Sequence, residues 1–113
     1  PGGKGKGPGS KSDWAKLIQD YHFTSEADAI AYPYNPVDNL KEIVKAKIPI
    51  IHVVGGADEV VPVDDNTYLL KSRLEQLGSR MELIVKPGGL HHPHGLDDPT
   101  PVVDFILNAF QKR

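Results

Sequence analysis

The sequence predicts an α/β protein in which parallel strands alternate with helices. Two short runs rich in apolar and β-branched residues, at residues 50–54 and 81–86, have the length of strands. A polar loop and then a segment with helical spacing follow each run, and this alternation implies parallel strands joined by helical crossovers. The run at 50–54 is apolar apart from His52, which predicts a strand buried on both faces.

The first expected helix carries an apolar stripe that we predict to face the core. Its members fall at positions i, i+3, i+4 and i+7: Trp14, Leu17, Ile18 and Tyr21. Ser12 or Asp13 is expected to cap this helix.

Two shorter helices are expected before the first strand. Residues 25–31 begin with Ser25 and Asp28 in the spacing of a capping box. Residues 36–45 follow Asn35, which with the next residue, a proline, forms a favourable N-cap and N1 pair.

Two longer helices are expected in the second half. The first is predicted to be capped by Asp64 or Asp65 and to end at Gly78. The second opens at Thr100, next to a proline suited to the first turn. Its apolar stripe has helical spacing and is also predicted to face the core: Val103, Ile106, Leu107 and Phe110.

Composition excludes several function classes. The 113 residues allow one domain at most, and the absence of cysteine excludes disulfides, thiolate metal sites and cysteine nucleophiles. A formal net charge of -2 gives no electrostatic reason to bind nucleic acid or anionic lipid. The short apolar runs predict no membrane span. The first residues lack the apolar stretch of a signal peptide. Because the chain has no cysteine, its composition fits an oxidising and a reducing compartment equally.

Residues 1–11 are rich in glycine and lysine and are predicted to form a linker or loop. They lack the G-x-x-x-x-G-K-[ST] spacing of a phosphate-binding loop.

The loops that follow the two strands carry the residues suited to chemistry. Asp58 follows the first strand, and His91 follows the second. In a parallel sheet these loops meet at the carboxyl edge, where an aspartate can accept a hydrogen bond from an imidazole. Such a bond fixes the tautomer of a general-base histidine and stabilises its imidazolium form.

Both loops resemble segments of the α/β-hydrolase family. VVGGADEVVP, residues 53–62, is similar to the G-x-x-D-x-x-V-P segment that carries the catalytic acid, and KPGGLHHPHGL, residues 86–96, is similar to the segment that carries the catalytic histidine. The order of acid and then histidine matches this fold, and 33 residues separate Asp58 from His91, room for one helix and one strand. Leu90 stands where the family commonly has glycine.

The resemblance implies the C-terminal part of an α/β-hydrolase fold. Residues 48–113 would supply the last two parallel core strands with flanking helices, and residues 12–47 a helical, partial cap region. The chain would then be a fragment of a serine-type ester hydrolase in which Asp58 orients His91. The family implies no cofactor, and its nucleophile motif, G-x-S-x-G, is absent from the sequence.

From this we expect an N-terminal half or an oligomer partner to complete the sheet, and no activity without the nucleophile. The expected substrate is a small-molecule ester, with a small acyl group on a sugar or another alcohol, as in carbohydrate esterases.

Other interpretations stay open at the level of sequence. Asp58 can instead be a turn residue, and Glu59 can replace it as the acid. His92 or His94 can be the catalytic imidazole, and the three histidines can together bind a metal. Adjacent ligands on one short loop rarely close a tetrahedral site, so we expect no metal.

His52, within a strand, is expected to be a satisfied core or boundary residue. A non-catalytic binding or scaffold module that retains hydrolase-like loops is the alternative function.

Overall fold

The computed structural model describes residue 7 and residues 9–111, so most of the predicted linker at residues 1–11 lies outside the described residues. The elements follow one another in this order: α1 (Lys11–Asp20), α2 (Glu26–Ile30), the 3₁₀ turn η1 (Pro36–Asp38), α3 (Lys41–Lys45), β1 (Ile51–Gly55), the π-helical turn η2 (Asp64–Tyr68), α4 (Leu69–Gln76), β2 (Glu82–Lys86) and α5 (Thr100–Gln111).

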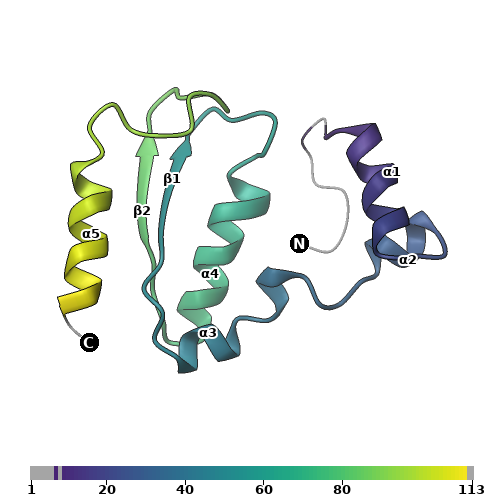
Figure 1. The fold of residues 1–113 in the computed structure, drawn as a ribbon, viewed down its shortest axis with the longest axis horizontal. Helices are drawn as coiled ribbons and strands as arrows, with labels where there is room; N and C mark the ends of the chain where they lie inside the picture. Colours follow the sequence, from purple (N-terminus) through teal and green to yellow (C-terminus); the bar gives the residue numbers. More distant parts are fainter. Residues whose placement is uncertain (1–6, 8, 112–113) are drawn as a thin grey trace.

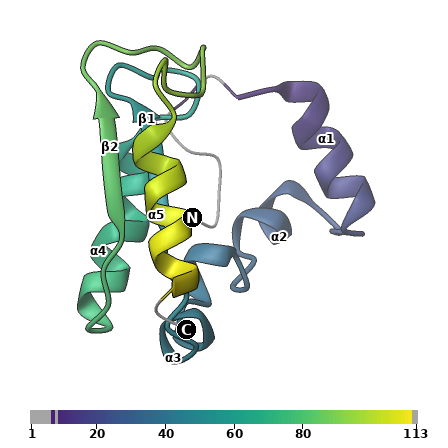
Figure 2. The ribbon, with the colours of Figure 1, turned by 60° about the vertical axis from the view of Figure 1, so that its left-hand side comes forward.

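The two strands form a parallel sheet, as the alternation of strands and helices predicted. The pairing runs in register from Ile51 opposite Glu82 to Gly55 opposite Lys86. The crossover between them contains α4, and Figure 1 shows both strand arrows pointing the same way. Figure 1 and Figure 2 together place α4 and α5 on opposite sides of the sheet. The protein therefore belongs to the α/β class.

The small core lies toward the amino ends of the strands. Its buried members are Leu40, Leu74 and Met81, and four half-buried side chains pack against them: Ile43, Val44, Ile50 and Leu70. This cluster joins α3 and α4 to the residues that precede the strands. The carboxyl ends of the strands, with the predicted chemical loops, lie at the other end of the sheet (Figure 1).

Burial of the first strand on both faces was predicted and is wrong for the described sheet. Only Gly55 of β1 is buried, and the other four residues are half-buried. With two strands in the described sheet, each strand has an edge without a neighbour, and an apolar run cannot be fully covered there.

The helix stripes predicted to face the core are also incompletely covered. Neither α1 nor α5 contributes a fully buried residue. The four stripe residues of α5 keep between 46% and 71% of their surface exposed. The Cα radius of gyration is 16.0 Å, against about 13 Å for a compact domain of this length. Amphipathic spacing identifies an apolar face but does not supply a surface to cover it.

Helix capping agrees with prediction at two sites and departs from it at others. The Ser25 side chain accepts a hydrogen bond from the Asp28 amide (3.1 Å), and Gly78 ends the α4 segment at φ 73°. The cap of α1 is Ser10, rather than Ser12 or Asp13, because the helix begins earlier than its apolar stripe.

The helix predicted at residues 36–45 is instead divided into η1 and α3. Asn35 does not cap it through its side chain, because its amide nitrogen donates to the Tyr32 carbonyl (2.7 Å) and to Asp38 (3.0 Å). Asp64 and Asp65 likewise lie within the first turn of η2 rather than at its cap.

Candidate functional site

A tight turn follows β2 and starts the histidine loop. The Gly89 amide donates to the Lys86 carbonyl (2.9 Å), which closes a four-residue turn, and Gly88 lies at φ 67°. Proline and then a glycine with positive φ at the two central positions are typical of a type II turn. The sequence Lys-Pro-Gly-Gly therefore sets the direction in which the chain leaves the strand.

Backbone contacts join the loop after β1 to this turn. The Gly56 amide donates to the Lys86 carbonyl (3.0 Å), and the Ala57 amide donates to the Gly89 carbonyl (2.9 Å). Gly55 allows the approach, because a Cβ there would lie 2.3 Å from the Leu90 oxygen and 2.5 Å from the Gly89 oxygen. The two loops that carry Asp58 and His91 therefore meet through glycine backbone.

Asp58 uses each carboxylate oxygen for a different purpose. Its Oδ1 accepts hydrogen bonds from the amides of Val60 (2.9 Å) and Val61 (2.8 Å) and so holds the loop in an Asx-type turn. The Val61 amide holds the pKa of Asp58 below its ordinary value, with smaller contributions from His91 and Val60, whereas burial acts in the opposite direction. Asp58 is therefore ionised at neutral pH.

His91 is joined to the second oxygen of this carboxylate. Its Nδ1 lies 2.9 Å from Asp58 Oδ2. The side chains are 28% and 13% exposed for His91 and Asp58, so the pair is largely shielded from solvent. An ionised carboxylate can only accept a hydrogen bond, so Nδ1 carries the proton. In the neutral ring, Nε2 then has a free lone pair, which is the tautomer that a general base needs.

The structure also separates the other candidates for acid and base. Glu59 is exposed, and no hydrogen bond or ion pair joins it to the described part of the chain. His92 and His94 are exposed as well, and of these three histidines only His91 is hydrogen-bonded to Asp58. The hydrogen bond expected between the two loops therefore joins Asp58 and His91, the residues that match the hydrolase motifs.

His52 lies on β1, as expected for a boundary residue with a hydrogen-bond partner. It is half-buried, and its Nδ1 lies 3.1 Å from the hydroxyl of Thr67, which is 5% exposed. This pair joins the strand to η2 rather than forming part of the site.

A pocket of about 210 Å³ opens beside the pair at the carboxyl end of β1. Its walls combine valines of β1 and the following loop with the polar side chains of Asn66 and Thr67, and both Asp58 and His91 line it. Such a space, apolar with a few polar groups, is typical of a site for a small molecule or for part of a larger one.

Lys86 was missed by the sequence reasoning. Its ammonium group donates to the carbonyls of Pro93 and Gly95 (3.0 Å for Gly95) and so holds the histidine loop on both sides of His94. No sequence pattern marks such a lysine, because any residue can offer the backbone oxygens that it contacts. The path of the loop decides which oxygens come within its reach, and the sequence does not specify that path.

The described residues contain no helix that is both long and apolar enough to cross a membrane. Comparisons with family models, with curated proteins and with solved structures found no match to this chain. The resemblance of the two loops to α/β-hydrolase segments therefore stays a prediction from the sequence.

Proposed function

We propose that Asp58 and His91 are the catalytic acid and general base of a serine-type ester hydrolase. The chain would form the C-terminal part of an α/β-hydrolase fold, with residues 12–47 as a partial cap region. The observation that carries the proposal is the hydrogen bond of 2.9 Å between His91 Nδ1 and Asp58 Oδ2 at the carboxyl ends of two parallel strands. An imidazole oriented by a carboxylate is the pairing that a general base in acyl transfer uses, and the carboxyl ends of parallel strands are where open α/β sheets carry their sites.

In the proposed reaction, His91 Nε2 removes the proton of a serine hydroxyl as the oxygen attacks an ester carbonyl. Asp58 stabilises the imidazolium that forms. The imidazolium then returns the proton to the leaving alkoxide, and an acyl-serine remains. Water, deprotonated by the same Nε2, hydrolyses the acyl-serine and restores both groups.

The serine in this proposal comes from outside the 113 residues, because the sequence lacks a G-x-S-x-G elbow. The open sheet edges and the exposed stripe of α5 support a partner, either an N-terminal half of the fold or another subunit. The pocket beside His91, of about 210 Å³, has room for a small group, which favours esters with a small acyl group. A sugar or another alcohol is the proposed alcohol part. The chemistry needs no cofactor.

The tautomer of His91 is the first test, and it uses the 113-residue chain itself. Two-bond ¹H–¹⁵N correlation spectra are expected to report an Nδ1–H ring in the parent protein. In Asp58→Asn, the amide oxygen keeps the two backbone hydrogen bonds, and the amide NH₂ faces Nδ1. The ring then accepts at Nδ1 and carries its proton on Nε2.

Glu59→Gln is the matched control, because it makes the same chemical change at the neighbouring exposed carboxylate. It is expected to leave the His91 tautomer unchanged. An unchanged tautomer in Asp58→Asn would mean that this carboxylate does not orient the ring.

The nucleophile is tested in the longer protein that contains this chain, or in the chain reconstituted with its partner. A fluorophosphonate probe is expected to label one serine outside the 113 residues, and Asp58→Asn is expected to lower kcat by roughly 10⁴-fold. Absence of a labelled serine from the whole assembly would favour the binding or scaffold module. Full ester turnover by the isolated chain would contradict an external serine.

A further inference from the structure

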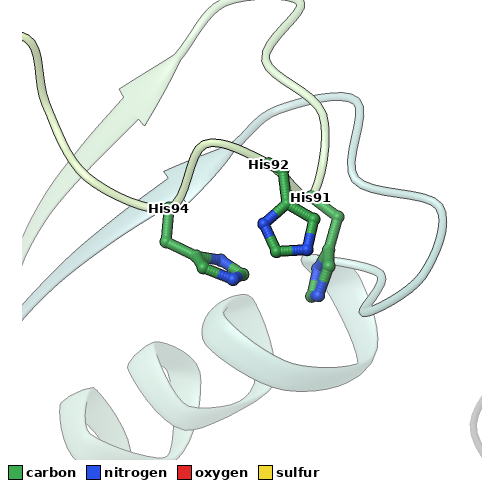
Figure 3. A group of neighbouring side chains, drawn as sticks. All are labelled: His91, His92 and His94. Atoms are coloured by element: carbon green, nitrogen blue, oxygen red, sulfur yellow. The ribbon is translucent and has the colours of Figure 1, made fainter.

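The loop after β2 brings three imidazoles together. Figure 3 shows His91, His92 and His94 beneath this loop, with their rings turned toward one another. One ring nitrogen from each residue lies within 4.8 Å of the other two. The ring centroid of His91 lies 4.8 Å from that of His92 and 4.8 Å from that of His94. The ring centroids of His92 and His94 lie 4.2 Å apart.

This convergence differs from what their adjacency in sequence led us to expect. The loop folds back after Pro93, so His94 faces the other two rings instead of pointing away. Lys86 holds the loop at the carbonyls on both sides of His94. The fold therefore sets the path of the loop backbone before any ligand binds, which lowers the entropic cost of binding.

The nitrogens needed for ligation are available. Asp58 occupies Nδ1 of His91, which leaves the Nε2 lone pair for a ligand. A carboxylate behind a metal-binding imidazole is a common arrangement that orients the ring and raises its basicity. His92 and His94 have no hydrogen-bond partner within the described residues, and their exposed side chains are free to rotate.

We propose that His91, His92 and His94 bind a divalent transition-metal ion of the Zn²⁺ class. Bonds of 2.0–2.1 Å in a tetrahedral site place ligand nitrogens about 3.3 Å apart. One nitrogen from each ring already lies within 4.8 Å of the others, about 1.5 Å more than this spacing, and rotation of the exposed His92 and His94 side chains would bring their nitrogens to Nε2 of His91. Imidazoles select Zn²⁺, Cu²⁺ and Ni²⁺ over Mg²⁺ and Ca²⁺, and three of them leave the fourth position to water.

This site goes beyond the proposed hydrolase function and does not depend on it. The metal would occupy Nε2 of His91, the atom that takes the serine proton in the proposed reaction. One residue cannot perform both roles at once, so bound metal would block the general base.

The test is calorimetric titration of the 113-residue chain with Zn²⁺, after prior removal of metals with a chelator. We expect one ion per chain, and no binding of Mg²⁺ under the same conditions. His92→Ala and His94→Ala each remove a ligand and should weaken Zn²⁺ binding by more than about 100-fold. This is more than the roughly 10–100-fold loss expected when a residue that only hydrogen-bonds a ligand is removed. Asp58→Asn should weaken it by about 10–100-fold, because it places the proton on Nε2.

His22→Asn is the control, since His22 is an exposed histidine far along the chain from this cluster, and asparagine tolerates its positive φ of 56°. Binding in this variant should equal that of the parent. Substitution by Co²⁺ should give the intense visible absorption of a tetrahedral ion. Three results would each overturn the site: no stoichiometric Zn²⁺, equal affinity for Mg²⁺, or affinity unchanged in His92→Ala and His94→Ala. None depends on whether a serine is labelled elsewhere, so this failure is distinguishable from failure of the hydrolase proposal.

Discussion

Gly55→Ala tests whether the close approach of the two loops builds the Asp58–His91 pair. The added Cβ would lie 2.3 Å from the Leu90 oxygen and 2.5 Å from the Gly89 oxygen. Ordinary contacts between carbon and oxygen are about 3.3–3.6 Å, so each is roughly 1 Å too short. Both obstacles are backbone atoms and cannot swing aside as a flexible side chain does.

The loops must therefore separate, and the expected cost follows from what the separation breaks. Overpacking of this kind costs about 1–3 kcal/mol. The hydrogen bond between the Ala57 amide and the Gly89 carbonyl (2.9 Å) is weakened as well, which adds about 1 kcal/mol. We expect the free energy of unfolding to fall by about 2–4 kcal/mol in total.

Urea unfolding measures this loss, and the two-bond NMR correlation of His91 reports whether its contact with Asp58 survives. Gly95→Ala is the matched control, because a Cβ at Gly95 meets no atom within 4 Å, and its effect should stay within about 0.5 kcal/mol. If Gly55→Ala unfolded at the urea concentration of Gly95→Ala and kept the Nδ1–H tautomer, the close approach would not hold the site together.

Two further predictions concern the remainder of the fold. Leu74 is 1% exposed at the centre of the small core, so Leu74→Ala should lower the free energy of unfolding by about 2–3 kcal/mol, measured by urea unfolding. Leu77 is 39% exposed, so Leu77→Ala is the control and should lower the free energy of unfolding by less than about 1 kcal/mol. The Asn35 side-chain amide and then Arg73 hold the pKa of Asp38 below its ordinary value. The ionised Asp38 therefore stabilises the folded protein fully at a pH above the ordinary carboxyl pKa, and this stabilisation is lost as the pH falls through the lowered pKa of the folded state. Arg73→Met should make the loss of stability in that acidic range shallower in unfolding experiments across pH, and an unchanged slope would show that the arginine does not act on this carboxyl.

The order and type of the main elements could be predicted because their signals are local. The strand at 50–54, the helix after Ser25 and the end of the α4 segment at Gly78 each follow from residues within a few positions. The cap of α1 was misplaced because the run Ser-Lys-Ser-Asp offers several capping residues, and the choice depends on where the helix begins.

Burial could not be predicted in the same way. The stripes on α1 and α5 have helical spacing, but covering them requires other parts of a structure to pack there. Leu74 is buried because Leu40, Met81 and side chains of α3 pack in the same cluster, whereas Phe110 stays 71% exposed on an equally periodic stripe. Spacing along one helix carries no information about such partners.

The site shows the same limit at the scale of single residues. Asp58 follows from a motif confined to one loop, but His91, His92 and His94 are chemically alike and adjacent. The residue that meets the carboxylate is decided by the turn at Gly88 and by the contacts of Lys86 with loop carbonyls. These are tertiary features, so the sequence restricts the imidazole to three candidates and the fold selects among them.

The turn-forming and catalytic interpretations of Asp58 are not alternatives, because different atoms carry them. Oδ1 holds the backbone of Val60 and Val61, and Oδ2 faces His91. Alanine at this position would remove both interactions, so a loss of activity could reflect only a collapsed loop. Asparagine keeps the acceptor for the backbone and replaces the oxygen that faces the imidazole with a donor. The effect of asparagine on the His91 tautomer therefore measures the orienting role separately from the structural one, and it applies equally to a general base and to a metal ligand.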